Sequence, residues 1–391
     1  MITFDFELLR GIGLSETLAQ RARDAADAER GDAGDADIDT NDTDTDDACA
    51  NVSCADHAGD AALALMRVIA VHRTALQLHD GRTVRAARIL PRLLRDAAGA
   101  GALAVGDWVL VGIDAAADLW VRARVEPTSH IARRDGDGSR HPIVSNVDRA
   151  LVVMGLDDDF NLRRLERYLS LVLASGVEPL VVLSKADIAA ADPARRDARI
   201  AQLRDRLAPG LEVVAVDATD PASAASFAAV TGFGQTLVVL GSSGAGKSSL
   251  TNTLLGASVQ DTGAVRVHDG RGMHTTTARS LHRLPGGACI IDTPGLRTLR
   301  PDADAEALRA SFADVATLSS RCRFRDCAHA GEPGCAVRAG VDPDRLDNFQ
   351  KMLRENRRDT LTWIERRQQL SAWKSRGREA RVRVKMKRGE G

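Results

Sequence analysis

The chain has 391 residues, and its 53 lysines and arginines nearly balance its 54 aspartates and glutamates. This length is enough for two or three domains with substantial cores, while the balanced charge by itself indicates no partner. Six cysteines in a chain of this size argue against a disulfide scaffold, and with neither a secretory signal nor an apolar run long enough for a bilayer we expect a cytoplasmic protein.

The N-terminal part of the chain contains a strongly acidic segment. Residues 24–60 hold 13 acidic side chains and one arginine, with almost no bulky apolar residues. Because such a segment cannot bury enough apolar surface to offset the entropy of ordering, we predict that it is disordered. Its spaced aspartates resemble a calcium loop, but the glycine and glutamate that such a loop needs are missing, which favours a solvated linker.

Residues 63–140 are predicted to form a compact β-barrel. Apolar runs at 67–71, 85–90, 106–111 and 120–125 are separated by turns, and several short strands in one small region are typical of an OB-fold. These strands alternate apolar residues with arginine, which gives a face able to meet the phosphates of RNA. A solvated arginine-rich face explains the pattern equally well.

Residues 141–300 follow a different pattern, in which apolar strands alternate with helices. Four continuous apolar runs predict strands at 150–154, 179–183, 212–216 and 236–240. Runs of this kind are typical of a parallel α/β sheet covered on both faces. The rest of the chain is predicted to be helical around a cysteine cluster, and the predicted division is 1–62, 63–140, 141–300 and 301–391.

A glycine-rich loop, GxxxxGK[ST], follows the last of these strands and precedes a helix. Glycines let backbone amides turn inward around phosphates, and the helix N-terminus adds positive potential. We expect Lys247 to reach the β- and γ-phosphates and the Ser248 hydroxyl to ligate Mg²⁺. This context favours a nucleoside triphosphate site over a structural glycine turn. The predicted binding residues are Gly241, Ser242, Ser243, Gly244, Ala245, Gly246, Lys247, Ser248 and Ser249.

A DxxG segment, Asp292 to Gly295, follows the phosphate loop. Asp292 is expected to hold the coordination shell of Mg²⁺, and the Gly295 amide is expected to bind the γ-phosphate. A glycine-flanked threonine run between the two motifs fits a switch in which Thr276 or Thr277 completes the Mg²⁺ coordination when γ-phosphate is present. A turn with exposed hydroxyls is the alternative.

A base-reading motif of the [N/T]KxD type lies before the phosphate loop, directly after the strand at 179–183. Asp187 is expected to accept hydrogen bonds from the N–H groups of guanine, and the stem of Lys185 to pack over the base. Serine replaces the usual asparagine at the first position. The motif consists of Ser184, Lys185, Ala186 and Asp187. Because ordinary GTPases carry it after the other two motifs, the chain resembles a circularly permuted GTPase.

Hydrolysis by such a site is expected to be slow. Leu296 stands where Ras-like enzymes have a water-positioning glutamine, and leucine cannot orient water. The missing group must come from His274, a monovalent cation or a bound partner. His274 is equally well explained as a surface histidine.

A cysteine–histidine cluster occupies the C-terminal region. Cys322, Cys327, His329 and Cys335 supply three thiolates and one imidazole within 14 residues. This is a filled tetrahedral set, so we predict one structural Zn²⁺ with no open position for water. The spacing is unlike CxxC, which disfavours a redox role or a disulfide.

A basic tail ends the chain, with eight lysines and arginines and one glutamate in residues 374–388. Such a tail suits a polyanion, although a solvated tail is the usual explanation. The chain also has a predicted barrel, a metal knuckle and a nucleotide loop, and these features favour RNA as the polyanion that the tail binds.

The chain resembles the ribosome small-subunit-dependent GTPase A family. The resemblance covers roughly residues 66–370 and is carried by the three nucleotide motifs, the zinc spacing, Asn146–Asp148, Asp159–Tyr168 and His274–Thr277. It implies a multidomain protein with an N-terminal OB-fold, a central circularly permuted P-loop GTPase domain and a C-terminal α-helical zinc-binding domain. It also implies GTP hydrolysis that the small subunit stimulates, a role in late subunit maturation, and as partners the small ribosomal subunit, its rRNA and other assembly factors. A monomer without membrane contact is expected.

Two other functions remain open on the sequence. The first is a nucleotide-gated RNA-binding module in which turnover is incidental. The second is a small-molecule P-loop kinase, which would prefer ATP and would need an acceptor pocket.

Overall fold

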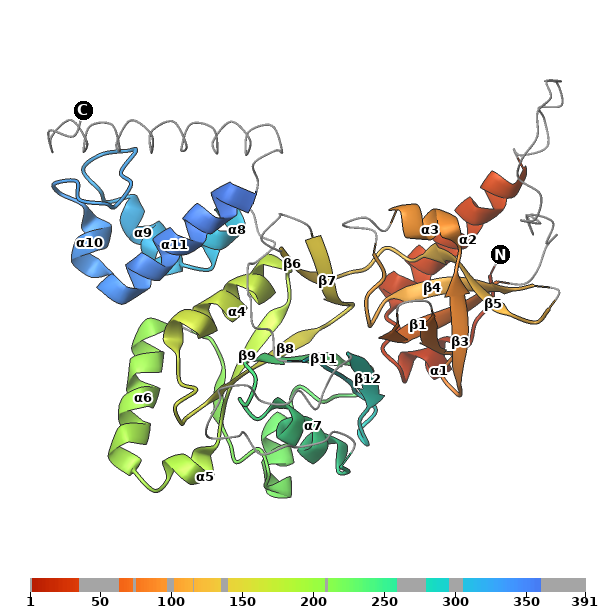
Figure 1. Cartoon of the computed structure of the whole chain (residues 1–391), viewed down its shortest axis with the longest axis horizontal. Helices are drawn as coiled ribbons and strands as arrows, with labels where there is room; N and C mark the ends of the chain where they lie inside the picture. The colour runs from red at the N-terminus through yellow and green to blue at the C-terminus, as the bar shows by residue number, and fades with distance from the viewer. Residues whose placement is uncertain are drawn as a thin grey trace, which may run out of the picture. The chain divides into compact units, whose positions relative to one another are not determined.

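The computed structural model describes residues 2–34, 63–72, 75–96, 102–114, 116–134, 140–207, 210–258, 279–294 and 305–359. The chain divides into two compact units, Met1–Arg133 with Arg140–Asp302 and Arg134–Ser139 with Ala303–Gly391 (Figure 1). The finer boundaries at residues 62, 140 and 300 remain predictions. None of the helices in the described ranges is long and apolar enough to cross a membrane.

The predicted α/β sheet forms the centre of the first unit. Its strands lie in the order β10-β9-β8-β11-β13-β12, and all are parallel except β12, which runs antiparallel to β13. The four predicted apolar runs coincide with four of these strands to within two residues. The strands are β8 (Arg149–Gly155), β9 (Glu178–Ser184), β10 (Val213–Ala215), β11 (Thr236–Gly241), β12 (Ser280–Arg283) and β13 (Cys289–Asp292).

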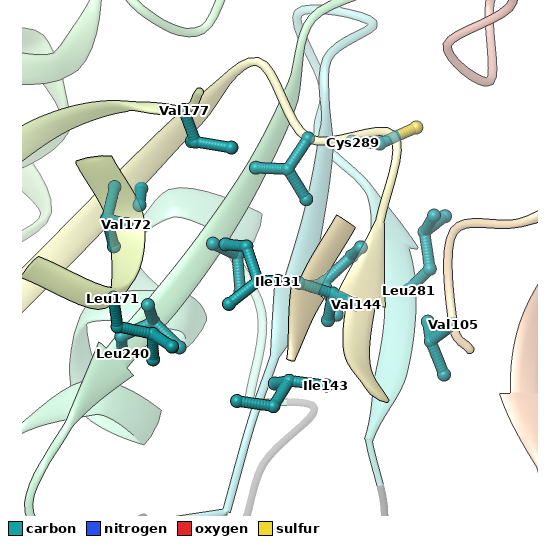
Figure 2. Packing of buried hydrophobic residues seen from close by; sticks show 14 of the residues in the cluster. Val105, Ile131, Ile143, Val144, Leu171, Val172, Val177, Leu240, Leu281 and Cys289 are labelled. Atoms are coloured by element: carbon teal, nitrogen blue, oxygen red, sulfur yellow. The ribbon is translucent and has the colours of Figure 1, made fainter. Parts of the chain in front are cut away.

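Helices cover both faces of this sheet, as continuous apolar strands require. Helices α4 (Leu162–Ala174) and α6 (Pro193–Arg206) share one apolar cluster with Val152, Val181 and Leu240. Helix α7 (Lys247–Leu255) and the 3-10 segment η1 (Pro221–Phe227) share the other, with Leu151, Val182 and Val239. Figure 2 shows part of the first cluster, which residues of β6 (His130–Arg134) and β7 (Arg140–Ser145) also enter.

The strand order places the base-reading motif and the phosphate loop at the carboxyl ends of β9 and β11, the two strands that flank β8. From β8 the chain proceeds outward through β9 to β10, then returns to place β11 on the other side of β8. Ligands of open α/β sheets bind where the strand order reverses, outside the carboxyl ends of the strands. The loops after β8, β9 and β11 therefore converge on a predicted ligand position, whatever their order in the chain.

The predicted β-barrel is confirmed and has five strands. They pair in the order β1-β2-β3-β5-β4, and a β1–β4 pairing closes the barrel around an apolar interior that includes Met66, Leu78 and Val121. The strands are β1 (Ala64–Val71), β2 (Leu76–His79), β3 (Val84–Ile89), β4 (Trp108–Ile113) and β5 (Leu119–Arg124), with a short helix α3 (Pro91–Asp96) between β3 and β4.

The barrel is joined to the α/β sheet by backbone and side-chain contacts. Strand β1 pairs with β12 in an antiparallel bridge between Ala70 and Ser280. Arg67, fully buried on β1, donates to the carbonyl oxygen of Asn146 at 3.1 Å and to the Thr236 hydroxyl at 3.0 Å. Because a buried guanidinium is costly unless each donor is satisfied, these bonds fix the barrel against the start of β11.

Two helices precede the barrel, and the second corrects one sequence prediction. Helices α1 (Phe6–Arg10) and α2 (Glu16–Gly34) are ordered, so the prediction of disorder from residue 24 is wrong for residues 24–34; residues 35–60 lie outside the described ranges. Leu18, Ala22 and Ala26 form a buried helical face that packs on β4 and β5. The composition argument missed this face because its C-terminal part consists of alanines, which add little bulky apolar surface.

The second unit has a small helical core of its own. Phe312 and Phe349 pack with ring centroids 5.0 Å apart, and the Arg345 guanidinium lies over the Phe312 ring while it pairs with Asp314. The helices are α8 (Ala305–Ala310), α9 (Ala313–Ser319), α10 (Ala336–Gly340) and α11 (Pro343–Asp359). The predicted basic tail lies outside the described residues.

Candidate nucleotide site and metal centre

The predicted phosphate loop connects β11 to α7. Gly246 has the left-handed φ of 91° and caps the N-terminus of α7. A Cβ atom there would lie 3.3 Å from the Ser184 hydroxyl, so the left-handed backbone favours glycine and the neighbouring loop leaves little room for a side chain. Ser248 and Ser249 follow in the first turn of the helix, where backbone amides and the helix dipole favour an anion.

Lys247 lies inside this loop and is mostly buried. Its Nζ donates to the carbonyl oxygen of Ser242 at 2.6 Å. Burial lowers the pKa of Lys247 to about 8, although the carboxylates of Asp292 and Asp159 act in the opposite direction. The ammonium group is thus held at the loop interior, where a phosphate oxygen can replace the carbonyl.

Asp292 ends β13 and is fully buried. Among the described residues neither of its carboxylate oxygens has a hydrogen-bond partner. Burial raises the pKa of Asp292 to about 6, against the influence of Lys247. Hard divalent cations prefer oxygen ligands, so a buried carboxylate with no side-chain hydrogen-bond partner among the described residues fits the predicted role of Asp292 in holding the Mg²⁺ shell.

The base-reading motif follows β9 and contacts the phosphate loop directly. The buried Ser184 hydroxyl donates to the carbonyl oxygen of Ala245 at 2.6 Å. Ala186 donates its amide to the carbonyl oxygen of Val216, and Asp187 is exposed in the short helix α5 (Ala186–Ala189). Serine at 184 therefore tethers the two loops, a contact that the sequence analysis did not predict.

Lys185 has a partner that the sequence analysis did not identify. Its φ is 61°, and its Nζ lies 2.7 Å from Oδ2 of Asp157. Asp157 and Asp159 belong to the loop between β8 and α4, and Asp159 accepts a hydrogen bond from the Ser242 hydroxyl at 2.6 Å. The available sequence signal was a run of three aspartates directly after a buried strand.

The remaining predicted nucleotide residues cannot be placed. His274, Thr276, Thr277 and Gly295 lie outside the described ranges, as does Leu296. Their roles stay predictions.

The four predicted zinc ligands lie together in the second unit. Their ligand atoms all fall within 4.8 Å of one another. The Sγ atoms of Cys322 and Cys335 are 3.9 Å apart, and they lie 3.7 Å and 3.4 Å from Nδ1 of His329. A tetrahedral ion with Zn–S distances of about 2.3 Å requires sulfur atoms about 3.8 Å apart, so the cluster fits Zn²⁺.

The surroundings of this cluster orient its imidazole. His329 has a left-handed φ of 58°, and its Nε2 lies 3.3 Å from the Ser319 hydroxyl. Gln350 donates to the His329 carbonyl oxygen at 2.9 Å. A zinc-bound histidine commonly has such a partner on its second nitrogen, which fixes the ring.

A basic cavity of about 620 Å³ opens beside this cluster. Phe349 and Leu353 contribute apolar surface, and Cys327 and His329 contribute to the wall. Asp326 is the one carboxylate among the lining residues that the structure describes. Four guanidinium groups line the same cavity, those of Arg309, Arg325, Arg354 and Arg357.

The protein resembles characterised proteins over most of its length. The family model described as RsgA GTPase matches residues 125–301. Proteins named small ribosomal subunit biogenesis GTPase RsgA, from Xanthomonas oryzae pv. oryzae (strain MAFF 311018) and Xanthomonas campestris pv. campestris (strain B100), are 45% and 46% identical to it over 256 residues. Each alignment covers 64% of this chain and 68% of the relative.

Two solved structures share the fold. The crystal structure of YjeQ from Thermotoga maritima matches with a TM-score of 0.55 and 20% identity, over 75% of this chain and 98% of that one. The crystal structure of YloQ, described as a circularly permuted GTPase, matches with a TM-score of 0.54 and 23% identity, over 78% of this chain and 99% of that one. These two likenesses show that the chain shares this fold.

Proposed function

The chain belongs to the RsgA GTPase family, and we propose that this GTPase binds the small ribosomal subunit and assists its late maturation. The family resemblance and multidomain fold expected from the sequence are confirmed, as is GTP hydrolysis as the activity. The proposal goes further in one respect. GTP hydrolysis is slow in the free protein and faster on the subunit, so that hydrolysis determines when the protein leaves the subunit.

The hydrogen bond from Ser184 to Ala245 is the observation that supports a single guanine-nucleotide site, on which this proposal rests. It brings the base-reading motif and the phosphate loop to one ligand position although they are far apart in the chain. Asp187 then reads guanine through its N–H groups, and Lys247 holds the β- and γ-phosphates. ATP offers neither of those N–H groups, which argues against the small-molecule kinase.

Mg²⁺ supplies charge neutralisation on the phosphates when it is bound. We assign its protein ligands as Ser248, Asp292 and one of Thr276 and Thr277. Because Leu296 cannot orient water, the group that activates water comes from His274, a monovalent cation or the subunit.

The second unit supplies the proposed contact with rRNA. Four arginines with one carboxylate form a cationic cavity, which suits the phosphates of RNA. We propose that Arg325→Ala and Arg354→Ala weaken subunit binding and reduce its salt dependence by about one phosphate contact each. Arg321→Ala, an exposed arginine of the same unit outside the cavity, is the matched control. Equal losses in all three variants would contradict this assignment.

Hydrolysis assays with and without purified small subunits test the proposed function. We expect stimulation of GTP hydrolysis, none with ATP, and loss of turnover in Lys247→Ala. Unstimulated hydrolysis with tight subunit binding would instead support the RNA-binding module with incidental turnover. We also propose that the protein works in the cytoplasm and acts as a monomer.

A further inference from the structure

Three consecutive aspartates follow β8, and the structure gives each a different environment. The side chain of Asp158 is 97% exposed, that of Asp157 is 32% exposed and that of Asp159 is 13% exposed. Among the described residues, Asp158 pairs only with Arg195 at the surface, at 3.2 Å. The two flanking residues point instead to the two loops of the nucleotide site.

Asp157 binds the lysine of the base-reading motif. Its Oδ2 lies 2.7 Å from the Lys185 Nζ, and its Oδ1 accepts the amide hydrogen of Asp159 at 3.2 Å. Burial alone would raise the pKa of Asp157, but these hydrogen bonds outweigh it and hold the pKa below its usual value. A Cβ atom on Gly155 would lie 2.3 Å from Oδ1 of Asp157, so glycine leaves the space that this carboxylate occupies.

Asp159 binds the phosphate loop. Its Oδ1 accepts from the Ser242 hydroxyl at 2.6 Å, and its Oδ2 accepts from the Gly155 amide at 3.2 Å. Arg164 pairs with the same carboxylate at 2.5 Å. This ion pair offsets the negative charge of Asp159 beside the predicted phosphate site. The hydroxyl of Ser242 is thus held by a group that belongs to neither nucleotide motif.

The loop that carries both aspartates is itself fixed. Arg199 of α6 donates to the carbonyl oxygens of Leu156 and Asp157, and its guanidinium lies 5.2 Å from the centre of the Phe160 ring. Asn161 caps α4 through a hydrogen bond from the Arg164 amide at 2.9 Å. Because both ends of the loop are anchored, the two carboxylates have a defined separation.

We propose that Asp157 and Asp159 are positioning residues for the GTPase site, where Asp157 orients Lys185 beside the base and Asp159 orients the phosphate loop through Ser242. One short loop then sets the spacing between the subsite for guanine and the subsite for phosphates. The proposal rests on the proposed function in one respect, since both motifs must bind the same nucleotide.

The three aspartates permit a matched test on the full-length protein. Asp157→Asn, Asp158→Asn and Asp159→Ala are compared for binding of GTP and ATP by competition against fluorescent GDP, with thermal unfolding as a check on folding. Loss of a charge-assisted hydrogen bond weakens binding by about tenfold or more. We expect Asp157→Asn to lose affinity for GTP but not for ATP, so that its base preference falls. Asp159→Ala should lose affinity for both nucleotides by the same factor and keep its base preference.

Asp158→Asn should match the wild type in both measurements. Equal effects of Asp157→Asn on GTP and ATP, or an unchanged affinity of Asp159→Ala, would overturn the proposal. A general structural role would lower thermal stability without separating the two nucleotides. Failure of the proposed function would show instead in the wild type, as absence of subunit stimulation or of a preference for GTP.

Discussion

The Ser184 hydroxyl donates a hydrogen bond of 2.6 Å to the carbonyl oxygen of Ala245, a residue 61 positions further along the chain. Ser184 follows β9 and Ala245 lies in the loop that leads to α7, so this bond connects the two halves of the nucleotide site. A circular permutation changes the order of the strands along the chain, but each strand keeps the same neighbours in the sheet. The bond therefore forms although the motifs are reversed.

Ser184→Ala should weaken nucleotide binding. The substitution leaves the buried carbonyl oxygen of Ala245 without its donor, which costs about 1–3 kcal/mol, or about 5- to 150-fold in affinity if the loop relaxes away from the nucleotide. Titration with fluorescent GDP measures the effect. Ser175→Ala is the control, because it removes a similar hydroxyl bond, to Leu171 at the end of α4, away from the site. Unchanged affinity in the Ser184 variant would show that the bond does not organise the loops.

Nucleotide binding should take up protons at pH 8. Burial lowers the pKa of Lys247 to about 8, so about half of the free protein carries a neutral amine at that pH. Contact with phosphates favours the ammonium form, and binding therefore takes up about half a proton, a quantity that falls toward zero as the pH is lowered to 6.5. Calorimetry in two buffers with different ionisation enthalpies measures this uptake. Lys247→Arg should abolish it, and an equal uptake in that variant would assign the proton to another group.

Asp292→Asn should stabilise the nucleotide-free protein and abolish hydrolysis. Burial raises the pKa of Asp292 from its usual value to about 6, so ionisation destabilises the fold as the pH rises from about 4 to about 6. The neutral amide removes that penalty, a gain of about 1–3 kcal/mol that is complete above pH 6 and absent below pH 4. Denaturant unfolding at pH 7.5 and pH 4 measures it. A loss of stability at pH 7.5 would contradict the view that burial makes the ionised form of this carboxylate costly in the nucleotide-free protein.

Cys327→Ser should release the metal and loosen the second unit. The cluster of three thiolates and one imidazole replaces part of a hydrophobic core, and such domains depend on zinc for folding. Elemental analysis should find one zinc ion per chain in the wild type and in Cys289→Ala, whose cysteine is buried in β13. We expect much less zinc in Cys327→Ser, with lost helical signal and lost stimulation by the subunit. Full zinc content in that variant would mean that the ligand assignment is wrong.

Local patterns predicted most of the fold and the position of the phosphate loop between a strand and a helix. Continuous apolar runs located β8, β9, β10 and β11, and the glycine loop fell between a strand and a helix as its chemistry requires. These features are determined by residues that are adjacent in the sequence, so a local pattern is enough to predict them. Composition failed at residues 24–34, because the face that α2 buries is built from small residues that charge counting ignores.

Contacts between distant segments could not be predicted in the same way. The pairing of Asp157 with Lys185 depends on β8 and β9 being adjacent, and that of Asp159 with Ser242 depends on β8 and β11 being adjacent. The β1–β12 bridge likewise joins two regions that the sequence presents as separate domains. A run of three aspartates was visible, but only the side-chain contacts of the folded chain show which of them bind the nucleotide loops.

The nucleotide preference of Asp187→Asn is the most direct test of the account. Guanine offers two N–H groups to the carboxylate, whereas xanthine offers a carbonyl oxygen that needs the N–H donor of an asparagine amide. Competition of GTP and xanthosine triphosphate against fluorescent GDP or xanthosine diphosphate measures that preference. We predict that the wild type prefers GTP, that Asp187→Asn prefers xanthosine triphosphate, and that adding Lys247→Ala abolishes both. A variant that still prefers GTP as the wild type does would contradict the claim that the two motifs share one guanine nucleotide.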